Sequence, residues 1–258
     1  MTSTIVIKLG GSLVSHPGVE LFDFSYLDSL KTVLIDKSND DKRFFLAVGG
    51  GNIMRRYRDL AKKAGATNDM DLHWIGTTVN VLHAYLVKAF FSDLADEKVM
   101  KYEDYYVDLK GELNSKIQVG GGSSVISDEI ERKYTIAKKI MVGGGGRPGH
   151  SGDVDAILAA RIFGSDTVVS LKNVDGVYES DPKINPNAKR ISKLTWDEYF
   201  EIIGFKKDHE PGGNYPIDPI ASQIGKDRKL KFVVLGGDDL DNFGRYLKGE
   251  EFIGTEVS

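Results

Sequence analysis

The sequence predicts an α/β fold in which helices cover both faces of a mostly parallel central sheet. Short apolar runs recur along the chain, and stretches with apolar residues at helical spacing separate them. Glycine-rich turns directly follow several of these runs, as expected where a buried strand passes into a helix. Because neither a fixed-period repeat nor a clean linker divides the chain, we expect one domain over residues 1–258.

In the N-terminal half, two short apolar runs at residues 5–9 and 44–48 each end in a glycine cluster, which is typical of buried parallel strands. Residues 22–35 lie between them and carry apolar side chains at helical spacing. Residues 53–64 continue the second glycine cluster as a helix. Residues 79–90 then form a longer helix with one wide apolar face.

In the C-terminal half, a helix is predicted over residues 127–138, because acidic residues occupy its first turn, and a strand follows at 139–142. After a glycine-rich turn come a helix at 153–163 and a buried strand at 167–171. The polar, glycine-containing segment 110–124 interrupts this order, and we interpret it as a surface hairpin or flap. A mobile loop at 206–215, a strand at 232–235 and a helix at 240–248 complete the expected elements.

Composition and charge exclude several classes of protein. Lys and Arg number 34 against 38 Asp and Glu, and no basic run exceeds a pair, so we expect no nucleic-acid partner. The absence of cysteine excludes disulfides and thiolate metal sites. Apolar stretches are too short to span a bilayer, and the N-terminus leads into a strand without a charged leader. We therefore expect a soluble, cytoplasmic protein with no membrane partner.

Three strand-to-helix turns carry glycine, at residues 10–11, 49–51 and 143–149. In a parallel sheet these turns share the carboxyl edge, where backbone amides and helix N-termini bind anions. One cluster alone would be a tight turn, whereas three together indicate one or two ligands with several phosphates. The P-loop spacing is absent. Residues 144–149 match the dinucleotide pattern G-x-G-x-x-G, but no acidic residue closes the next strand, where a dinucleotide site needs one to contact the ribose.

Two charged residues lie next to these turns. Lys8 interrupts an apolar strand just before the first glycine cluster, where a buried ammonium requires an anionic partner. The simpler explanation is an edge-strand lysine that reaches water, but a cation beside an amide-lined turn is what a transferring phosphoryl group needs. Asp153 follows the third cluster. It could merely favour the helix N-terminus, or it could orient Lys8 or the acceptor.

Several motifs are shared with one known family. They are residues 8–12 (Lys-Leu-Gly-Gly-Ser), 48–51 (Val-Gly-Gly-Gly), 173–183 (beginning Asn-Val-Asp-Gly-Val-Tyr) and 248–255 (Lys-Gly-Glu-Glu-Phe-Ile-Gly-Thr). On these motifs the chain resembles the amino acid kinase superfamily. Residues 147–150 and 213–221 make it most similar to the uridylate (UMP) kinases of the archaeal type. The resemblance spans nearly the whole chain, except the segment around 110–124.

The resemblance implies an open αβα sandwich that transfers a phosphoryl group from ATP, accompanied by Mg²⁺, to UMP. It implies an N-terminal half that binds the acceptor, a C-terminal half that binds ATP, and a homo-oligomer, either a dimer or a hexamer. Lys8 would stabilise the transferred phosphoryl group, and Asp153 would position it. The residues implied for ATP are Gly10, Gly11, Ser12, Gly51, Arg55, Lys172, Asn173, Asp175, Tyr178, Asp181 and Lys183; those implied for the acceptor are Gly49, Gly50, His73, Gly76, Gly146, Arg147, Gly149, His150 and Ser151.

Some positions depart from the uridylate kinase pattern. His73 replaces an aspartate that grips the acceptor ribose, His83 replaces an asparagine, and Lys172 occupies a usual threonine position. Residues 151–153 read Ser-Gly-Asp, which is closer to isopentenyl phosphate kinases, although those carry a histidine where this chain has Asn52. The histidines lack metal-binding spacing, and we interpret His73 and His83 as pocket-lining or core residues.

These departures keep two alternatives open. One is a kinase of the same fold with another phosphate or carboxylate acceptor. The other is a nucleotide-binding storage or regulatory protein without activity, as molybdenum storage proteins are on this fold.

Overall fold

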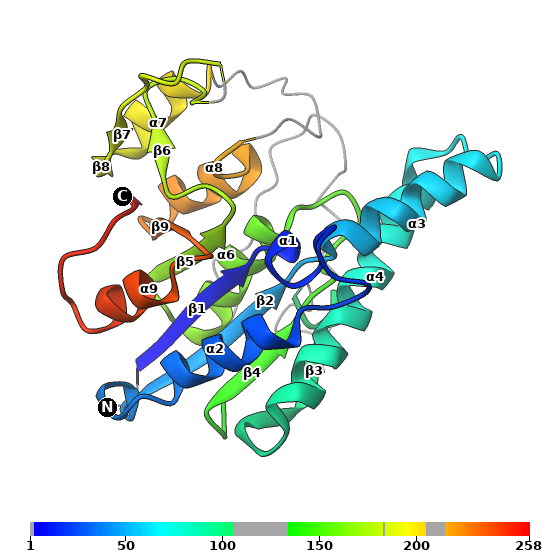
Figure 1. The fold of residues 1–258 in the computed structure, drawn as a ribbon, viewed down its shortest axis with the longest axis horizontal. Coiled ribbons are helices and arrows are strands. Elements are labelled where there is room, and N and C mark those ends of the chain that lie inside the picture. The colour runs from blue at the N-terminus through cyan, green and yellow to red at the C-terminus, as the bar shows by residue number, and fades with distance from the viewer. Residues whose placement is uncertain (1–2, 106–133, 183, 205–214) are drawn as a thin grey trace.

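The computed structural model describes residues 3–105, 134–182, 184–204 and 215–258. Its centre is an eight-stranded sheet in the order β3-β4-β2-β1-β5-β9-β10-β8 (Figure 1). The six strands from β3 to β9 are parallel, β10 runs antiparallel to β9, and β8 is parallel to β10. The predicted mostly parallel sheet is therefore confirmed. Its strands are β1 (Ser3–Leu9), β2 (Lys42–Val48), β3 (Ala95–Met100), β4 (Ile140–Gly143), β5 (Thr167–Lys172), β8 (Lys193–Leu194), β9 (Lys231–Gly236) and β10 (Thr255–Val257).

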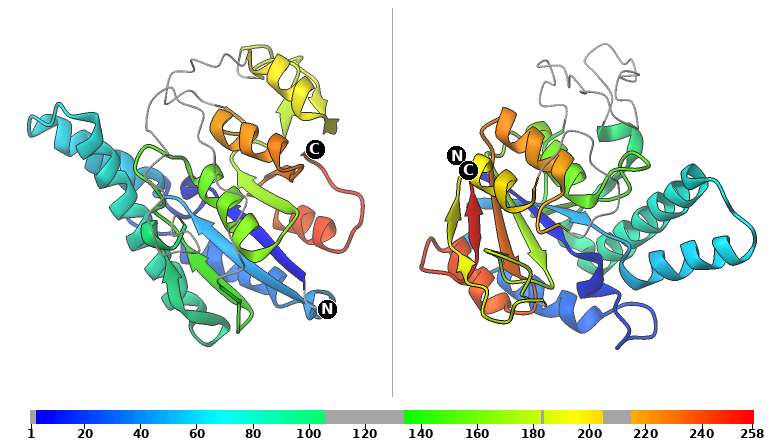
Figure 2. Two further views of the ribbon diagram at one scale, coloured as in Figure 1. Left: turned by 180° about the vertical axis from the view of Figure 1, so that it is seen from behind. Right: turned by 90° about the horizontal axis from the view of Figure 1, so that it is seen from above.

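Helices cover both faces of the sheet, as predicted (Figures 1 and 2). One apolar core lies between the sheet and α2, α4 and α9, and the second lies between the sheet and α6, α7 and α8. Since strand side chains alternate, Val6 belongs to the α6 core and Ile7 to the α2 core. The helices are α1 (Gly11–Val14), α2 (Phe24–Leu34), α3 (Gly51–Lys63), α4 (Asp69–Phe91), α5 (Tyr102–Tyr105), α6 (Gly152–Phe163), α7 (Trp196–Ile202), α8 (Pro219–Asp227) and α9 (Leu240–Leu247).

The long helix α4 has two apolar faces rather than the single one that the sequence indicates. Ala84, Val87 and Phe91 are buried against the sheet. Leu82 and Tyr85, which belong to the apolar face predicted over residues 79–90, are 53% and 49% exposed. The helix α3 packs along the N-terminal part of α4, and the pair extends beyond the sheet (Figure 2). None of the described helices combines the length and apolar character needed to cross a membrane.

The helix predicted over residues 127–138 is wrong where the structure describes it. Residues 134–138 are not helical. The carboxylate of Asp96 accepts the backbone amides of Ala137 and Lys138, at 3.0 and 2.7 Å, so these groups are bonded to a side chain instead of to a preceding helical turn. The proposed flap at 110–124 and nearly all of the loop at 206–215 lie outside the described residues.

Some elements were not predicted. They include β3, the helices α7 and α8, and a separate two-stranded hairpin of β6 (Val177–Tyr178) and β7 (Arg190–Ile191). The start of α7 is fixed by a capping box, in which Thr195 and Glu198 satisfy each other's backbone amides. Asp218 caps α8 by accepting the amides of Ile220 and Ala221.

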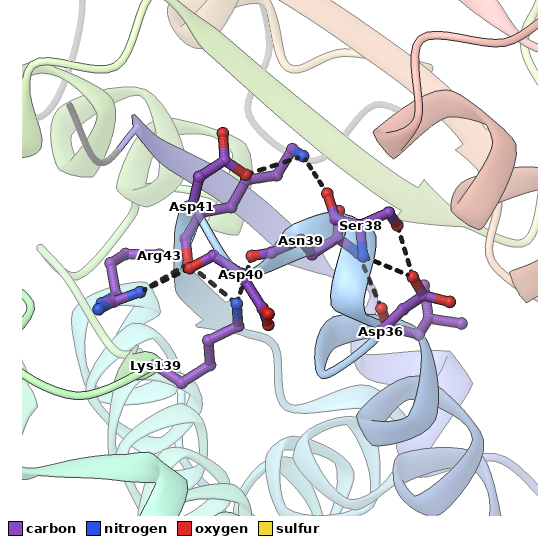
Figure 3. A network of polar contacts seen from close by, with 9 residues as sticks. Asp36, Ser38, Asn39, Asp40, Asp41, Arg43 and Lys139 are labelled. Atoms are coloured by element: carbon purple, nitrogen blue, oxygen red, sulfur yellow. Dashed lines mark hydrogen bonds and ion pairs between the residues drawn. The ribbon is translucent and has the colours of Figure 1, made fainter.

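A polar network joins the amino ends of β2 and β4, at the edge opposite the glycine turns (Figure 3). Lys139 donates to the carbonyls of Asn39 and Lys42, and Arg43 also donates to the Lys42 carbonyl, at 3.1 Å. Asp36 caps the short turn before β2 by accepting from Ser38. These contacts link the amino ends of the strands, whereas the candidate site lies at their carboxyl ends.

Candidate active site

Lys8 lies in the middle of the sheet and not at its edge. Its strand β1 is paired on one side with β2, where Lys8 opposes Ala47, and on the other with β5, where it opposes Ser170. The edge-strand explanation for this lysine is therefore wrong. Its side chain is 16% exposed, and its Nζ lies 3.7 Å from Oδ1 of Asp153.

A second lysine meets the same carboxylate. Lys172 lies two residues beyond Ser170 on β5, so its side chain leaves the same face of the sheet as that of Lys8. Its Nζ donates to Oδ2 of Asp153 at 2.8 Å and also to the carbonyl of Pro216. Asp153 lies in the first turn of α6 and additionally accepts the amide of Asp218 at 3.1 Å. Two cations thus share one buried carboxylate at the carboxyl edge of the sheet.

The electrostatics of this cluster make Lys8 unusual. Burial, followed by repulsion from Lys172, lowers the pKa of Lys8 from 10.5 to about 8, although Asp153 acts in the opposite direction. Burial by itself would raise the pKa of Asp153, but Lys172, Lys8 and the hydrogen bonds together hold it below its ordinary value. Near neutral pH Lys8 therefore remains protonated beside an ionised Asp153.

The first two glycine turns touch each other beside this cluster. A Cβ on Gly11 would lie 2.2 Å from the amide nitrogen of Gly51, and Gly51 has a φ of +53°, so a side chain fits at neither position. The amide of Gly10 donates to the carbonyl of Leu171 on β5, which ties the first turn to the strand that carries Lys172. The contact between Gly11 and Gly51 confirms the prediction that the first two turns share one edge of the sheet. Ser12 follows in α1, whereas Arg55 is exposed on α3.

The third turn connects β4 to α6 and is enclosed from both sides. A Cβ on Gly144 would lie 2.8 Å from the carbonyl of Asn80 on α4, and Gly145 has a φ of +65°. On the opposite side, the amide of Gly146 donates to Asp155 of α6 at 3.0 Å. The turn is therefore clamped between α4 and α6.

Beyond Gly146, the turn closes on itself. The amide of His150 donates to the carbonyl of Arg147, and Gly149 has a φ of +89°. Burial, together with the neighbouring charge of Arg147, lowers the pKa of His150 to about 4, so its ring is neutral at pH 7. Ser151 then forms the N-cap of α6.

The remaining residues expected near an acceptor lie on α3 and α4. Gly50 is the N-cap of α3, and a Cβ there would lie 2.6 Å from Oδ1 of Asn80. Gly76 allows α4 to approach Met54 on α3, and His73 is half-buried one turn earlier. His83 is fully buried, and its Nδ1 lies 3.1 Å from the carbonyl of Gly49. Its interpretation as a core residue is confirmed.

The residues expected near adenosine gather beside β6. The hydroxyl of Tyr178 donates to Asp175 at 2.7 Å, and the Arg190 side chain lies 3.8 Å from the same carboxylate. The carbonyl of Asp181 accepts the amides of Ile184 and Asn185 and forms a turn. Asn173 directly follows β5, whereas Lys183 lies outside the described residues.

Three residues of the site were missed by the sequence analysis. Asp218 contacts Asp153, Asp155 anchors the third turn, and Arg190 pairs with Asp175. The dipeptide Asp218-Pro219 is a helix-start signal that could have placed the first of these near the site. Nothing in the sequence indicates the partners of Asp155 or Arg190, because both contacts depend on how separate elements pack.

Comparison with known proteins gives a consistent result. The model of the amino acid kinase family matches residues 3–236. The chain is 32% identical over 237 residues to the uridylate kinase of Pyrococcus abyssi, and the match covers 91% of each chain. The crystal structure of uridylate kinase from Archaeoglobus fulgidus is similar with a TM-score of 0.70 and 27% identity, covering 98% of this chain and 99% of that one. UMP kinase from Ureaplasma parvum, at 22% identity and a TM-score of 0.74, covers 100% and 99% and shares the fold.

Proposed function

The chain belongs to the amino acid kinase family, and from this premise we propose that it transfers the γ-phosphoryl group of ATP to the phosphate of UMP, giving ADP and UDP. The observation that carries the proposal is the buried cluster of Lys8, Asp153 and Lys172 beside the glycine turns. The uridylate kinases among its relatives, which match over nine-tenths of the chain, support UMP as the acceptor.

Lys8 is proposed to stabilise the phosphoryl group during transfer. The acceptor phosphate is already nucleophilic, so the reaction needs positioning and charge neutralisation more than a strong base. An ammonium group in a buried site stabilises developing negative charge more than it would in water. Asp153 holds this ammonium in place, while Lys172 balances the charge of Asp153 so that Lys8 remains available to the phosphates.

We assign the residues of the glycine turns to two substrates, ATP and the acceptor. The amides of Gly10, Gly11, Ser12 and Gly51 are proposed to bind ATP phosphates together with Arg55. Asn173, Asp175, Tyr178, Asp181 and Lys183 are proposed to surround the adenosine, on the C-terminal half. The acceptor would contact Gly49, Gly50, His73 and Gly76 of the N-terminal half, together with Gly146, Arg147, Gly149, His150 and Ser151 of the third turn. The two halves would act as parts of one domain, since one sheet runs through both.

We propose that ATP enters this site with Mg²⁺. When bound, Mg²⁺ neutralises charge on the phosphates. It usually keeps several waters and takes ligands from substrate phosphates. In the described ranges no three acidic or histidine side chains gather into a ready-made cage, and Asp153 already faces two lysines and an amide. These residues fit an ion held by the ATP phosphates and water. We also propose a cytoplasmic location, where ATP is available as the donor.

We also propose that the protein is a homo-oligomer in which a second copy covers the exposed apolar face of α4. Leu82, Tyr85 and Leu86 lie close together on this helix, and Trp74 lies three turns earlier on the same side. Light scattering should give a multiple of the 28.4 kDa chain mass. The change Leu82→Asp should reduce that mass; a monomeric wild type would contradict the proposal.

An acceptor panel tests the function. ADP release is measured with Mg-ATP and UMP, CMP, AMP, isopentenyl phosphate or small acyl acids. We expect UMP to give the highest kcat/KM. Higher activity with another acceptor would identify a kinase of different specificity. ATP binding without ADP release from any acceptor would instead indicate a storage or regulatory protein.

A further inference from the structure

Asp155 is a buried acid that the phosphoryl-transfer machinery described above does not use. It lies in the first turn of α6, two residues after Asp153, and only 4% of it is exposed. Its Oδ2 accepts the amide of Gly146 at 3.0 Å, while its Oδ1 has no hydrogen-bond partner among the described residues. Its neighbours Val154 and Ala156 are fully buried, so an apolar side chain would suit this position better on energetic grounds.

The surroundings of Asp155 make its buried carboxyl group unfavourable for the stability of the fold. Burial raises its pKa to about 7, and the nearby carboxylates of Asp153 and Asp218 act in the same direction, opposed by the hydrogen bond from Gly146. A buried acid with a single neutral partner and two like charges nearby weakens the fold. Such groups concentrate at functional sites, which motivates a search for what Asp155 holds.

Gly146 and Asp155 fit closely against each other. A Cβ on Gly146 would lie 1.9 Å from Oδ1 of Asp155, so the turn reaches this position only because residue 146 is glycine. On the other side of the turn, Gly145 approaches the carbonyl of Thr77 on α4. Within the part of the chain that the structure describes, the Asp155 carboxyl is the only side chain of α6 that hydrogen-bonds this turn. The Asp155 carboxyl therefore fixes the position of the backbone directly before Arg147, in the segment that leads to His150.

We propose that Asp155 is a positioning residue that holds the turn of residues 143–149 against the same helix turn that carries Asp153, and so sets the distance between the bound acceptor and Lys8. This inference rests on the proposed function, because the acceptor is the ligand of that turn. Asp153 orients Lys8, and Asp155 orients the acceptor turn. One helical turn thus aligns both partners of the reaction.

Two variants separate positioning from folding. Asp155→Asn keeps an acceptor oxygen for the Gly146 amide, whereas Asp155→Leu keeps the branched arrangement of heavy atoms without one. The matched control is Asp96→Leu, which removes another buried aspartate that anchors backbone amides, at the distant edge strand β3. Because Asp155→Leu removes a costly buried acid, we expect its melting temperature at pH 8 to equal or exceed that of wild type.

The decisive readouts are the two Michaelis constants and amide exchange. Asp155→Leu should raise the KM for UMP at least tenfold with the KM for ATP within twofold of wild type, and Asp155→Asn should restore the KM for UMP. Hydrogen exchange at the Gly146 amide, measured without substrate, should accelerate at least tenfold in Asp155→Leu only. Unchanged exchange, or an unchanged KM for UMP in a folded Asp155→Leu protein, would overturn the inference. A wild-type protein that is inactive with UMP but whose Gly146 amide exchanges slowly would overturn the proposed function alone. The inferred role of Asp155 in holding the turn would then still stand.

Discussion

Replacing Lys172 with methionine tests how charge is balanced around Lys8. Methionine is unbranched like lysine and only slightly shorter, but it carries no charge, so repulsion of the Lys8 ammonium is lost. Burial, which is the largest cause of the lowered pKa of Lys8, remains, and Asp153 becomes free to attract Lys8 alone. The pKa of Lys8 should therefore rise from about 8 without reaching the ordinary 10.5.

The size of the change follows from the geometry. The two ammonium groups reach the two oxygens of one carboxylate, at 3.7 and 2.8 Å. Because both contact the same carboxylate, the two nitrogens lie no more than about 9 Å apart, and at this limit unit charges repel by about 2 kcal/mol at an effective dielectric constant of about 20. Because 1.36 kcal/mol corresponds to one pKa unit, the pKa of Lys8 should rise by about 1.5.

The assay is the pH dependence of kcat/KM for ATP, which reports groups in the free enzyme. Activity requires the protonated ammonium, so it should fall as pH rises through about 8 in the wild type. In Lys172→Met the fall should begin about 1.5 pH units higher. Lys226→Met, which removes an ion pair with Asp197 elsewhere on the surface, should leave the profile unchanged. An alkaline limb at the same pH in wild type and Lys172→Met would refute the reasoning.

Other changes probe the site and the fold. Lys8→Ala should lower kcat by about 10³ with the Kd for ATP, measured by calorimetry, nearly unchanged, and an unchanged kcat would remove Lys8 from the reaction. Gly11→Ala should destabilise the fold by about 1–3 kcal/mol in urea and weaken ATP binding, because its Cβ would collide with the Gly51 amide, whereas Gly244→Ala should do neither. The raised pKa of Asp155 means that the folded chain binds more protons than the unfolded one between pH 3.8 and about 7, so stability falls as pH rises through this window. Asp155→Asn should abolish this fall, a difference of about 4 kcal/mol at most, and parallel stability curves would contradict it.

The arrangement of the site edge could be predicted because it follows from general rules. Apolar runs that end in glycine indicated parallel strands, and parallel strands bring their carboxyl ends to one edge. Lys8 drew attention because an ammonium in an apolar strand needs an anionic partner. Asp153 was named because it begins the helix after the third glycine turn, and a role beside Lys8 was one of the two explanations given for it.

Other features depend on packing that the sequence does not encode locally. The strand β3 contains the polar run Asp96–Lys98, so it lacks the apolar signal of its neighbours. The acidic residues before residue 134 indicated a helix, yet Asp96 from a distant strand captures the amides of residues 137 and 138. The contact between Asp155 and Gly146 arises only once α6 has docked beside the third turn.

Phosphorus NMR of the wild-type protein with Mg-ATP and UMP tests the proposed transfer most directly, because it observes the bond that forms. Resonances of ADP and UDP should grow in equal amounts as those of ATP and UMP disappear. Inorganic phosphate in place of UDP, or a spectrum that does not change over hours, would contradict phosphoryl transfer to UMP at this site.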